Sequence, residues 1–172
     1  MAAQAQLQSD EKHAGKERLK LSWKKITTAT TRSDFGDPVG GSTVATLCIF
    51  NDGGILVGQP LVVDRGGQMC GGKPCWKATG SQGLAYQDKA ASADGITKMS
   101  FGGRPAGKGK ASAQGKNNAA KNQTSLPTGF AAALTGNTSP TIELVTSNGF
   151  CVGAKMNTVK KDDGQQYKAQ KK

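Results

Sequence analysis

The chain has 172 residues and a formal net charge of +11, from 23 Lys and Arg against 12 Asp and Glu. Hydrophobic residues make up 35% of it and glycine contributes 24 residues. Such a composition disfavours a helical bundle, because glycine costs roughly 1 kcal/mol in a helix interior. No apolar run approaches the ~18 residues that a transmembrane helix needs, so we expect no membrane span.

Residues 1–18 are polar, charged and rich in glutamine, which indicates a disordered N-terminal tail. The next segment alternates apolar and polar side chains, with Leu19, Leu21 and Trp23 on one face and Ile26 joining them after a slip of one residue. This period of two predicts a strand with one buried face. The long loop that follows, 27–41, contains Ser, Asp, Gly and Pro.

Two hairpins are predicted from their turn residues. Residues 42–50 and 55–63 flank Asn-Asp-Gly-Gly at 51–54, and residues 139–145 and 150–156 flank Ser-Asn-Gly at 147–149. Asn, Asp and Gly accept the positive φ angles of tight hairpin turns. Pro60 cannot donate to a β-ladder, so the return strand is expected to bend or to lie at an edge.

The middle of the chain contains further short strands, at 76–79, 83–86, 94–101 and 107–115, and residues 128–134 suit either a strand or one helical turn. This spacing predicts an all-β fold, an antiparallel β-sandwich or a barrel-like relative of roughly nine or ten short strands. We expect one domain over residues 19–156, between the tail at 1–18 and a charged C-terminal tail at 157–172.

Four cysteines, Cys48, Cys70, Cys75 and Cys151, allow three disulfide pairings. A zinc site is disfavoured because its ligands usually come in close pairs and the single histidine, His13, lies in the expected tail. The pairing we favour is Cys48–Cys70 with Cys75–Cys151, each worth ~2–4 kcal/mol. The alternative is four free thiols in a cytosolic protein.

Disulfides persist outside the cytosol, which predicts an extracellular or cell-surface location. The start of the chain, Met-Ala-Ala-Gln-Ala-Gln, resembles the small-residue end of a signal peptide whose apolar region has been removed. An ordinary cytosolic start is the alternative.

A set of short motifs runs through residues 20–156: K-L-S-W-K-K-I at 20–26, G-D-P-V-G-G at 36–41, L-C-I-F at 47–50, C-W-K-A-T-G-S-Q-G-L-A-Y-Q-D-K at 75–89, D-G-I at 94–96, G-K-G-K-A-S-A-Q-G-K at 107–116 and I-E-L-V at 142–145. Together they resemble an uncharacterised, often tandem, exported domain family of deltaproteobacteria and related soil bacteria. The resemblance implies a β-sandwich-like domain and supplies no catalytic residues. One departure is that the aromatic expected beside the last cysteine is Phe150, which precedes Cys151.

Catalytic chemistry finds little support. Nucleophilic catalysis needs a base within reach of the nucleophile, and His13 is the only histidine. Most aspartates lie in turns beside Gly or Pro, where they bond their own backbone. A Ca²⁺ site at Asp34 and Asp37 is the weaker alternative. The segment 102–109 lacks the Ser or Thr of a phosphate-binding loop. We therefore expect no enzyme, no metal and no cofactor.

A basic stretch at 102–121 contains no acidic residue; its cations are Arg104, Lys108, Lys110, Lys116 and Lys121. Such a stretch favours polyanions, but it contains none of the aromatics that single-stranded nucleic acid binding uses, so specific nucleic-acid recognition is disfavoured. The aromatics elsewhere, such as Trp23 and Trp76, are expected in the core. The sequence thus predicts a structural or interaction module that associates with itself or with other surface proteins; the alternative is a module that binds carbohydrate or polyanions, with polysaccharide as partner.

Overall fold

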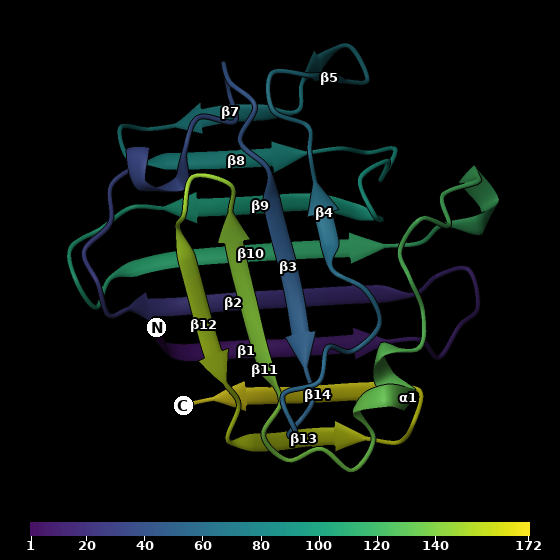
Figure 1. Cartoon of the computed structure of the whole chain (residues 1–172). Coiled ribbons are helices and arrows are strands. Elements are labelled where there is room, and N and C mark those ends of the chain that lie inside the picture. The colour runs from purple at the N-terminus through teal and green to yellow at the C-terminus, as the bar shows by residue number, and fades with distance from the viewer.

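A computed structural model describes all 172 residues as two antiparallel β-sheets packed face to face (Figure 1). The expected all-β sandwich is confirmed. Neither sheet closes on itself, since each has a linear strand order with two edges, so the barrel alternative is not formed. No helix is both long enough and apolar enough to cross a membrane.

The larger sheet has eight strands in the order β13-β14-β1-β2-β10-β9-β8-β7. Their bounds are β1 (Ala2–Asp10), β2 (Arg18–Ile26), β7 (Trp76–Thr79), β8 (Gly83–Gln87), β9 (Ile96–Gly102), β10 (Gly109–Lys116), β13 (Thr158–Asp162) and β14 (Gln166–Lys171).

The smaller sheet has four strands in the order β12-β11-β3-β4. Their bounds are β3 (Ala45–Phe50), β4 (Leu61–Val63), β11 (Thr141–Thr146) and β12 (Cys151–Lys155). The remaining elements are the two-stranded hairpin β5 (Met69–Cys70) and β6 (Lys73–Pro74), two 3₁₀ turns (Ser33–Phe35 and Ala119–Lys121) and the helix α1 (Phe130–Leu134).

The nine strands predicted between residues 19 and 156 are all present, and residues 128–134 form the single helical turn α1. The slip before Ile26 is a β-bulge. Ile26 pairs with Gly109 and Lys24 pairs with Lys110, so Lys25 is left unpaired with a φ of 52°. The return strand of the first hairpin is reduced to a bridge at Leu56 and the short β4, with Pro60 in the gap between them.

Both expected tails are wrong, because their residues form strands of the larger sheet. β1 pairs with β2 on one side and with β14 on the other, and β14 also pairs with β13. Ala5, Leu7, Tyr167 and Ala169 point into the core from β1 and β14. The alternation is present in both segments, but alanine marks it weakly and the glutamines between conceal it.

The core lies between the two sheets, and the smaller sheet covers only one face of the larger, its strands crossing the larger sheet's strands steeply (Figure 1). Trp23 is fully buried at the centre, and its Nε1 donates a hydrogen bond to the Ile142 carbonyl of β11 at 3.4 Å. Phe101 stacks on Trp76 and on Phe35, with ring centroids 5.6 and 5.0 Å apart. The other face of the larger sheet carries no second layer.

Candidate functional site

Seven cations lie on the uncovered face of the larger sheet, on four adjoining or nearly adjoining strands inside its two edge strands, whose Lys77 and Lys161 share their orientation. They alternate with buried residues, as in Arg18-Leu19-Lys20-Leu21 of β2, so the same period of two that fills the core turns them outward. We call this surface the basic face and define it by Arg18, Lys20, Lys24, Lys98, Lys110, Lys116 and Lys168.

Glutamine and serine fill the outward positions between the cations. β1 contributes Gln4, Gln6 and Gln8, and the hydroxyls of Ser100 and Ser112 hydrogen-bond across β9 and β10 at 2.9 Å. The only acidic side chain in these outward positions of the six strands from β14 to β8 is Asp10, at the end of β1. The surface is therefore hydrophilic and positive.

Two pairs of cations lie directly opposite each other on β2 and β10. Lys24 pairs with Lys110, and Arg18 pairs with Lys116. Cβ atoms at such positions are ~4.5–5.5 Å apart, and like charges there destabilise a sheet. The ion pairs of the protein are Arg65–Asp64 and Lys161–Asp163, so neither pair is relieved by a salt bridge. The Lys24–Lys110 pair has no carboxylate opposite it, whereas Asp10 of β1 lies opposite Arg18.

The carboxylates are used elsewhere, in loops. Ten of the twelve accept hydrogen bonds from backbone N–H groups: Asp10, Glu11, Glu17, Asp34, Asp37, Asp52, Asp88, Asp94, Asp162 and Asp163. This confirms the prediction that aspartates act mainly in turns. The Asp34 carboxylate accepts a hydrogen bond from the Thr31 N–H. The Asp37 carboxylate accepts hydrogen bonds from the N–H groups of Val39 and Gly40. The carboxylates act mainly in loops, whereas the cations of the basic face lie on strands. Negative and positive side chains are therefore separated on the protein.

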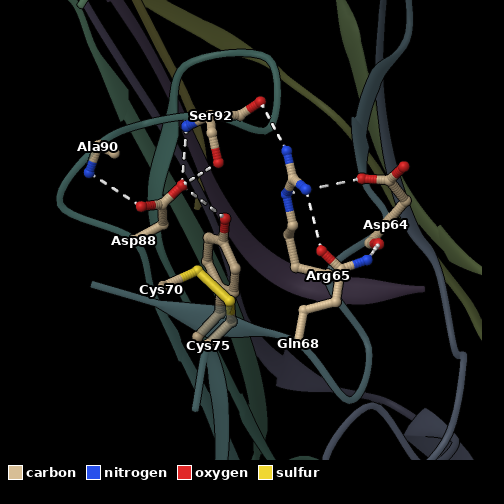
Figure 2. The surroundings of a disulfide bond; sticks show 9 residues. Asp64, Arg65, Gln68, Cys70, Cys75, Asp88, Ala90 and Ser92 are labelled. Atoms are coloured by element: carbon tan, nitrogen blue, oxygen red, sulfur yellow. Dashed lines mark hydrogen bonds and ion pairs between the residues drawn. A yellow bond between two sulfur atoms is a disulfide. The ribbon is translucent and has the colours of Figure 1, made fainter. Parts of the chain in front are cut away.

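One edge of the larger sheet ends at the Cys70–Cys75 disulfide, which closes the β5–β6 hairpin (Figure 2). Gly71 and Gly72, with φ angles of 61° and 79°, reverse the chain and bring the two Cα atoms to 4.9 Å. A hollow of about 560 Å³ lies against this hairpin. Its cationic lining residues are Lys73, Lys77, Lys89 and Lys121, and its one acidic lining residue is Asp88.

Asp88 is buried and holds the loop beside the disulfide (Figure 2). Its carboxylate accepts hydrogen bonds from the Ala90 N–H and from the N–H and hydroxyl of Ser92, at 2.7–2.8 Å, and the Tyr86 hydroxyl lies at 3.5 Å. Burial by itself raises the pKa of Asp88, but these hydrogen bonds outweigh it and hold that pKa below its ordinary value. Burial, reinforced by the Asp88 carboxylate, raises the pKa of Tyr86, so the hydroxyl stays a donor.

Arg65 joins this loop to the segment before the hairpin. Its guanidinium donates to Gln68 at 2.9 Å and to the Ser92 carbonyl at 3.2 Å, as Figure 2 shows. The wall of the hollow is therefore fixed by a disulfide, a buried carboxylate and an arginine. Asp88 has its acceptors occupied, so the charge that the hollow presents is that of its lysines.

The favoured disulfide pairing, Cys48–Cys70 with Cys75–Cys151, is wrong, because Cys70 pairs with Cys75 and the other two are free thiols. Cys48 of β3 and Cys151 of β12 are on opposite sides of β11 and opposite different residues of it, Glu143 and Val145, so their Cα atoms are more than two strand spacings, about 9.6 Å, apart. A disulfide needs Cα atoms within ~7 Å. Burial, then the nearby Glu143 carboxylate, raises the pKa of both thiols.

The five cations predicted from the stretch 102–121 are not brought together. Lys110 and Lys116 lie on the basic face at opposite ends of β10, whereas Lys121 lines the disulfide hollow. Arg104 and Lys108 lie in the loop between β9 and β10. Sequence reasoning missed Arg18, Lys20, Lys24, Lys98 and Lys168 because they come from three other strands. The detectable signal was the alternation of Lys or Arg with apolar residues in β2.

Seven of the nine aromatic residues are buried in the core: Trp23, Phe35, Trp76, Tyr86, Phe101, Phe130 and Tyr167. The single histidine, His13, is exposed in the turn that joins β1 and β2. Aromatic stacking on a ligand is thus not a property of the basic face. No family model, no curated protein and no solved structure matches the chain.

Proposed function

We propose that the protein is a non-enzymatic binding module of the cell surface or extracellular space and that its ligand is an acidic polysaccharide, which lies on the basic face. The observation that carries this proposal is the pairing of Lys24 with Lys110 and of Arg18 with Lys116. None of the four cations makes a salt bridge, and only Arg18 has a carboxylate, Asp10 of β1, opposite it. A polymer with repeated acidic groups would neutralise these pairs at several points at once.

The composition of the face favours a polysaccharide over nucleic acid. Side-chain amides and hydroxyls both donate and accept hydrogen bonds, which suits the hydroxyl groups of sugars. Single-stranded nucleic acids are held by aromatic stacking as well as by charge, and the aromatics of this protein are mainly in its core. The Cys70–Cys75 disulfide supports a location outside the cytosol.

The sheet edges favour this function over self-assembly by strand addition. The edge strand β13 carries Lys160 and Lys161 and has an irregular register between Val159 and Lys161. The opposite edge strand, β7, has four residues and exposes Lys77, and the edge strand β4 of the smaller sheet has three residues. Short edges, lysines and bulges are the features that discourage edge-to-edge pairing.

The test is retention on immobilised heparin, followed by titration with heparin at ~150 mM salt, where screening over ~8 Å removes weak long-range attraction. The variant carries Lys24→Gln, Lys110→Gln, Arg18→Gln and Lys116→Gln. We expect binding to weaken roughly 100-fold or more, since each cation near a polyanionic surface contributes on the order of 1 kcal/mol.

The matched control removes four cations outside the basic face, with Arg32→Gln, Arg104→Gln, Lys108→Gln and Lys155→Gln. Both variants have the same net charge, so only the position of the charges differs. The proposal requires the control to retain most of the affinity. Equal losses in the two variants would show a response to net charge alone and overturn the proposal, as would wild-type protein that is not retained.

A further inference from the structure

The register of the larger sheet aligns one row of side chains across six consecutive strands of the basic face. From β14 to β8 the row reads Lys168, Gln8, Lys20, Gln114, Lys98 and Gln87. Each member is directly opposite the next. Lysine and glutamine therefore alternate over these six strands, although no segment of the sequence contains this pattern. At the edge strand β13 the alternation ends, because Lys161 lies opposite Lys168.

Strand spacing sets the period of the row. Neighbouring strands lie ~4.8 Å apart, so the three lysines recur at about 9.6 Å with an amide between each pair. Phosphates follow one another at ~3.4 Å along a strand of B-DNA, which is a far denser charge pattern. A sugar in an extended β-linked polysaccharide advances its chain by about one strand spacing. The row thus fits a ribbon-like glycan with one sugar over each strand.

Shallow hollows follow the same row. The middle one, of about 460 Å³, is lined by Gln8, Lys20 and Gln114 together with Arg18 and Lys116. At the β14 end, Lys168 and Gln8 line a hollow of about 280 Å³ with Lys160 and Lys161. At the β8 end, Gln87 borders the lysine-lined hollow beside the disulfide. Hollows therefore lie along the row at three places, although Lys98 lines none of them.

We propose that this row is a set of sugar subsites for a linear polysaccharide in which an acidic sugar alternates with a neutral one. The proposal rests on the proposed function and specifies its ligand. Lys168, Lys20 and Lys98 each face a carboxylate, whereas Gln8, Gln114 and Gln87 face the hydroxyl or amide groups of the sugars between. A glycan with a carboxylate on every sugar would place half of its charges over glutamines.

The test compares three oligosaccharides of equal length by isothermal titration at ~150 mM salt: hyaluronan fragments, in which glucuronate alternates with N-acetylglucosamine; mannuronan fragments, with a carboxylate on every sugar; and neutral chitin fragments. We expect hyaluronan to bind roughly tenfold more tightly than mannuronan. Chitin fragments are expected to bind the most weakly. A ratio of dissociation constants that favours mannuronan would overturn the inference.

Charge-swapped variants sharpen the test. Gln8→Lys with Gln114→Lys supplies a cation under every sugar of the middle subsites, and we expect it to reverse the preference towards mannuronan. Lys24→Gln with Lys110→Gln lies on the basic face but outside the row, so it lowers the affinity for both acidic glycans and leaves their ratio unchanged. An unchanged ratio in the Gln8→Lys, Gln114→Lys variant would also overturn the inference.

The two proposals fail in different ways. If heparin binds and responds to the four-cation variant while hyaluronan shows no preference over mannuronan, the subsite assignment is wrong and the proposed function stands. If the wild-type protein binds neither heparin nor hyaluronan, both are wrong. Preferential binding of an oligonucleotide with the same number of charges would assign the basic face to a different polymer and overturn both.

Discussion

The two sheets have similar, apolar inner faces, but their outer faces differ in charge. Inside, each contributes alternate apolar residues to one core. Outside, the smaller sheet presents mainly uncharged side chains, such as Thr46, Cys48 and Val145, with Glu143 near its centre. The larger sheet presents seven cations separated by amides and hydroxyls.

This difference separates folding from function. The inner faces are constrained by packing, so their residues explain stability. The outer residues of the larger sheet include adjacent like charges that oppose folding, and nothing in the fold requires them. A surface that weakens the sheet without serving the core points to a ligand, and this is why we assign binding to the larger sheet.

The largest effect is expected from a substitution in the hydrophobic core that the two sheets share. Trp23→Ala deletes the fully buried indole that links β2 to β11 through the Ile142 carbonyl. We expect the free energy of unfolding, measured by urea titration, to fall by about 3–5 kcal/mol. Trp23→Phe keeps most of the buried area and should cost clearly less. A loss below ~1 kcal/mol for Trp23→Ala would mean that the sheets do not depend on a common core.

The next largest effect on stability is expected from the carboxylates that accept backbone hydrogen bonds in loops. Asp88→Ala leaves the N–H groups of Ala90 and Ser92 without their acceptor, and hydrogen bonds to charged groups contribute ~1.5–3 kcal/mol. Because hydrogen bonds hold the pKa of Asp88 below its ordinary value in the folded protein, its contribution is full above about pH 4, the ordinary range of an aspartate, and is lost as the pH falls through the lowered pKa. Urea titrations at pH 7 and pH 3 measure this.

Asp88→Asn is the matched variant for the pH dependence. It should lose less stability than the wild type between pH 7 and pH 3, because it has no carboxylate to protonate at this position. Asp64→Asn, at an exposed carboxylate, provides the control and should retain the wild-type pH dependence. An Asp88→Asn protein with wild-type acid sensitivity would contradict the role given to this carboxylate.

The two cysteines at the edge of the larger sheet form a disulfide, whereas the two cysteines of the smaller sheet are free thiols. Intact mass should show the native chain two hydrogens lighter than the reduced chain, as one disulfide requires. Cys70→Ala with Cys75→Ala should destabilise by about 2 kcal/mol, the value for a short closed loop. Cys48→Ser with Cys151→Ser should keep the mass difference. A native chain four hydrogens lighter would show that these thiols also pair.

The smallest effect is of opposite sign. Lys110→Gln removes one member of the Lys24–Lys110 pair and should stabilise the protein by about 0.2–1 kcal/mol at low salt, with a smaller gain at high salt. Glu143→Gln on the outer face of the smaller sheet has no such pair to relieve and should change stability by less than ~0.5 kcal/mol. Destabilisation by Lys110→Gln would contradict the charge strain inferred for the basic face.

Local patterns predicted much of the fold. The hairpin turn at Ser147–Gly149, the slip before Ile26 and the turn roles of the aspartates are all as expected, because each depends on a few adjacent residues. The tails were missed where alanine occupies inner positions, since a methyl group marks a buried face weakly. The disulfide was mispredicted because spacing alone does not reveal that Gly71 and Gly72 reverse the chain within their own hairpin.

By itself, the sequence determined which side chains of each strand face inward, because that alternation is a property of the extended backbone and requires no partner. Only the tertiary structure decided which strands are neighbours. That choice depends on how the whole core packs and on the register of pairs as distant in sequence as Gln8 and Lys168. The basic face and its alternating row depend on the tertiary structure, because their residues are far apart in the sequence and become neighbours only when the strands pair.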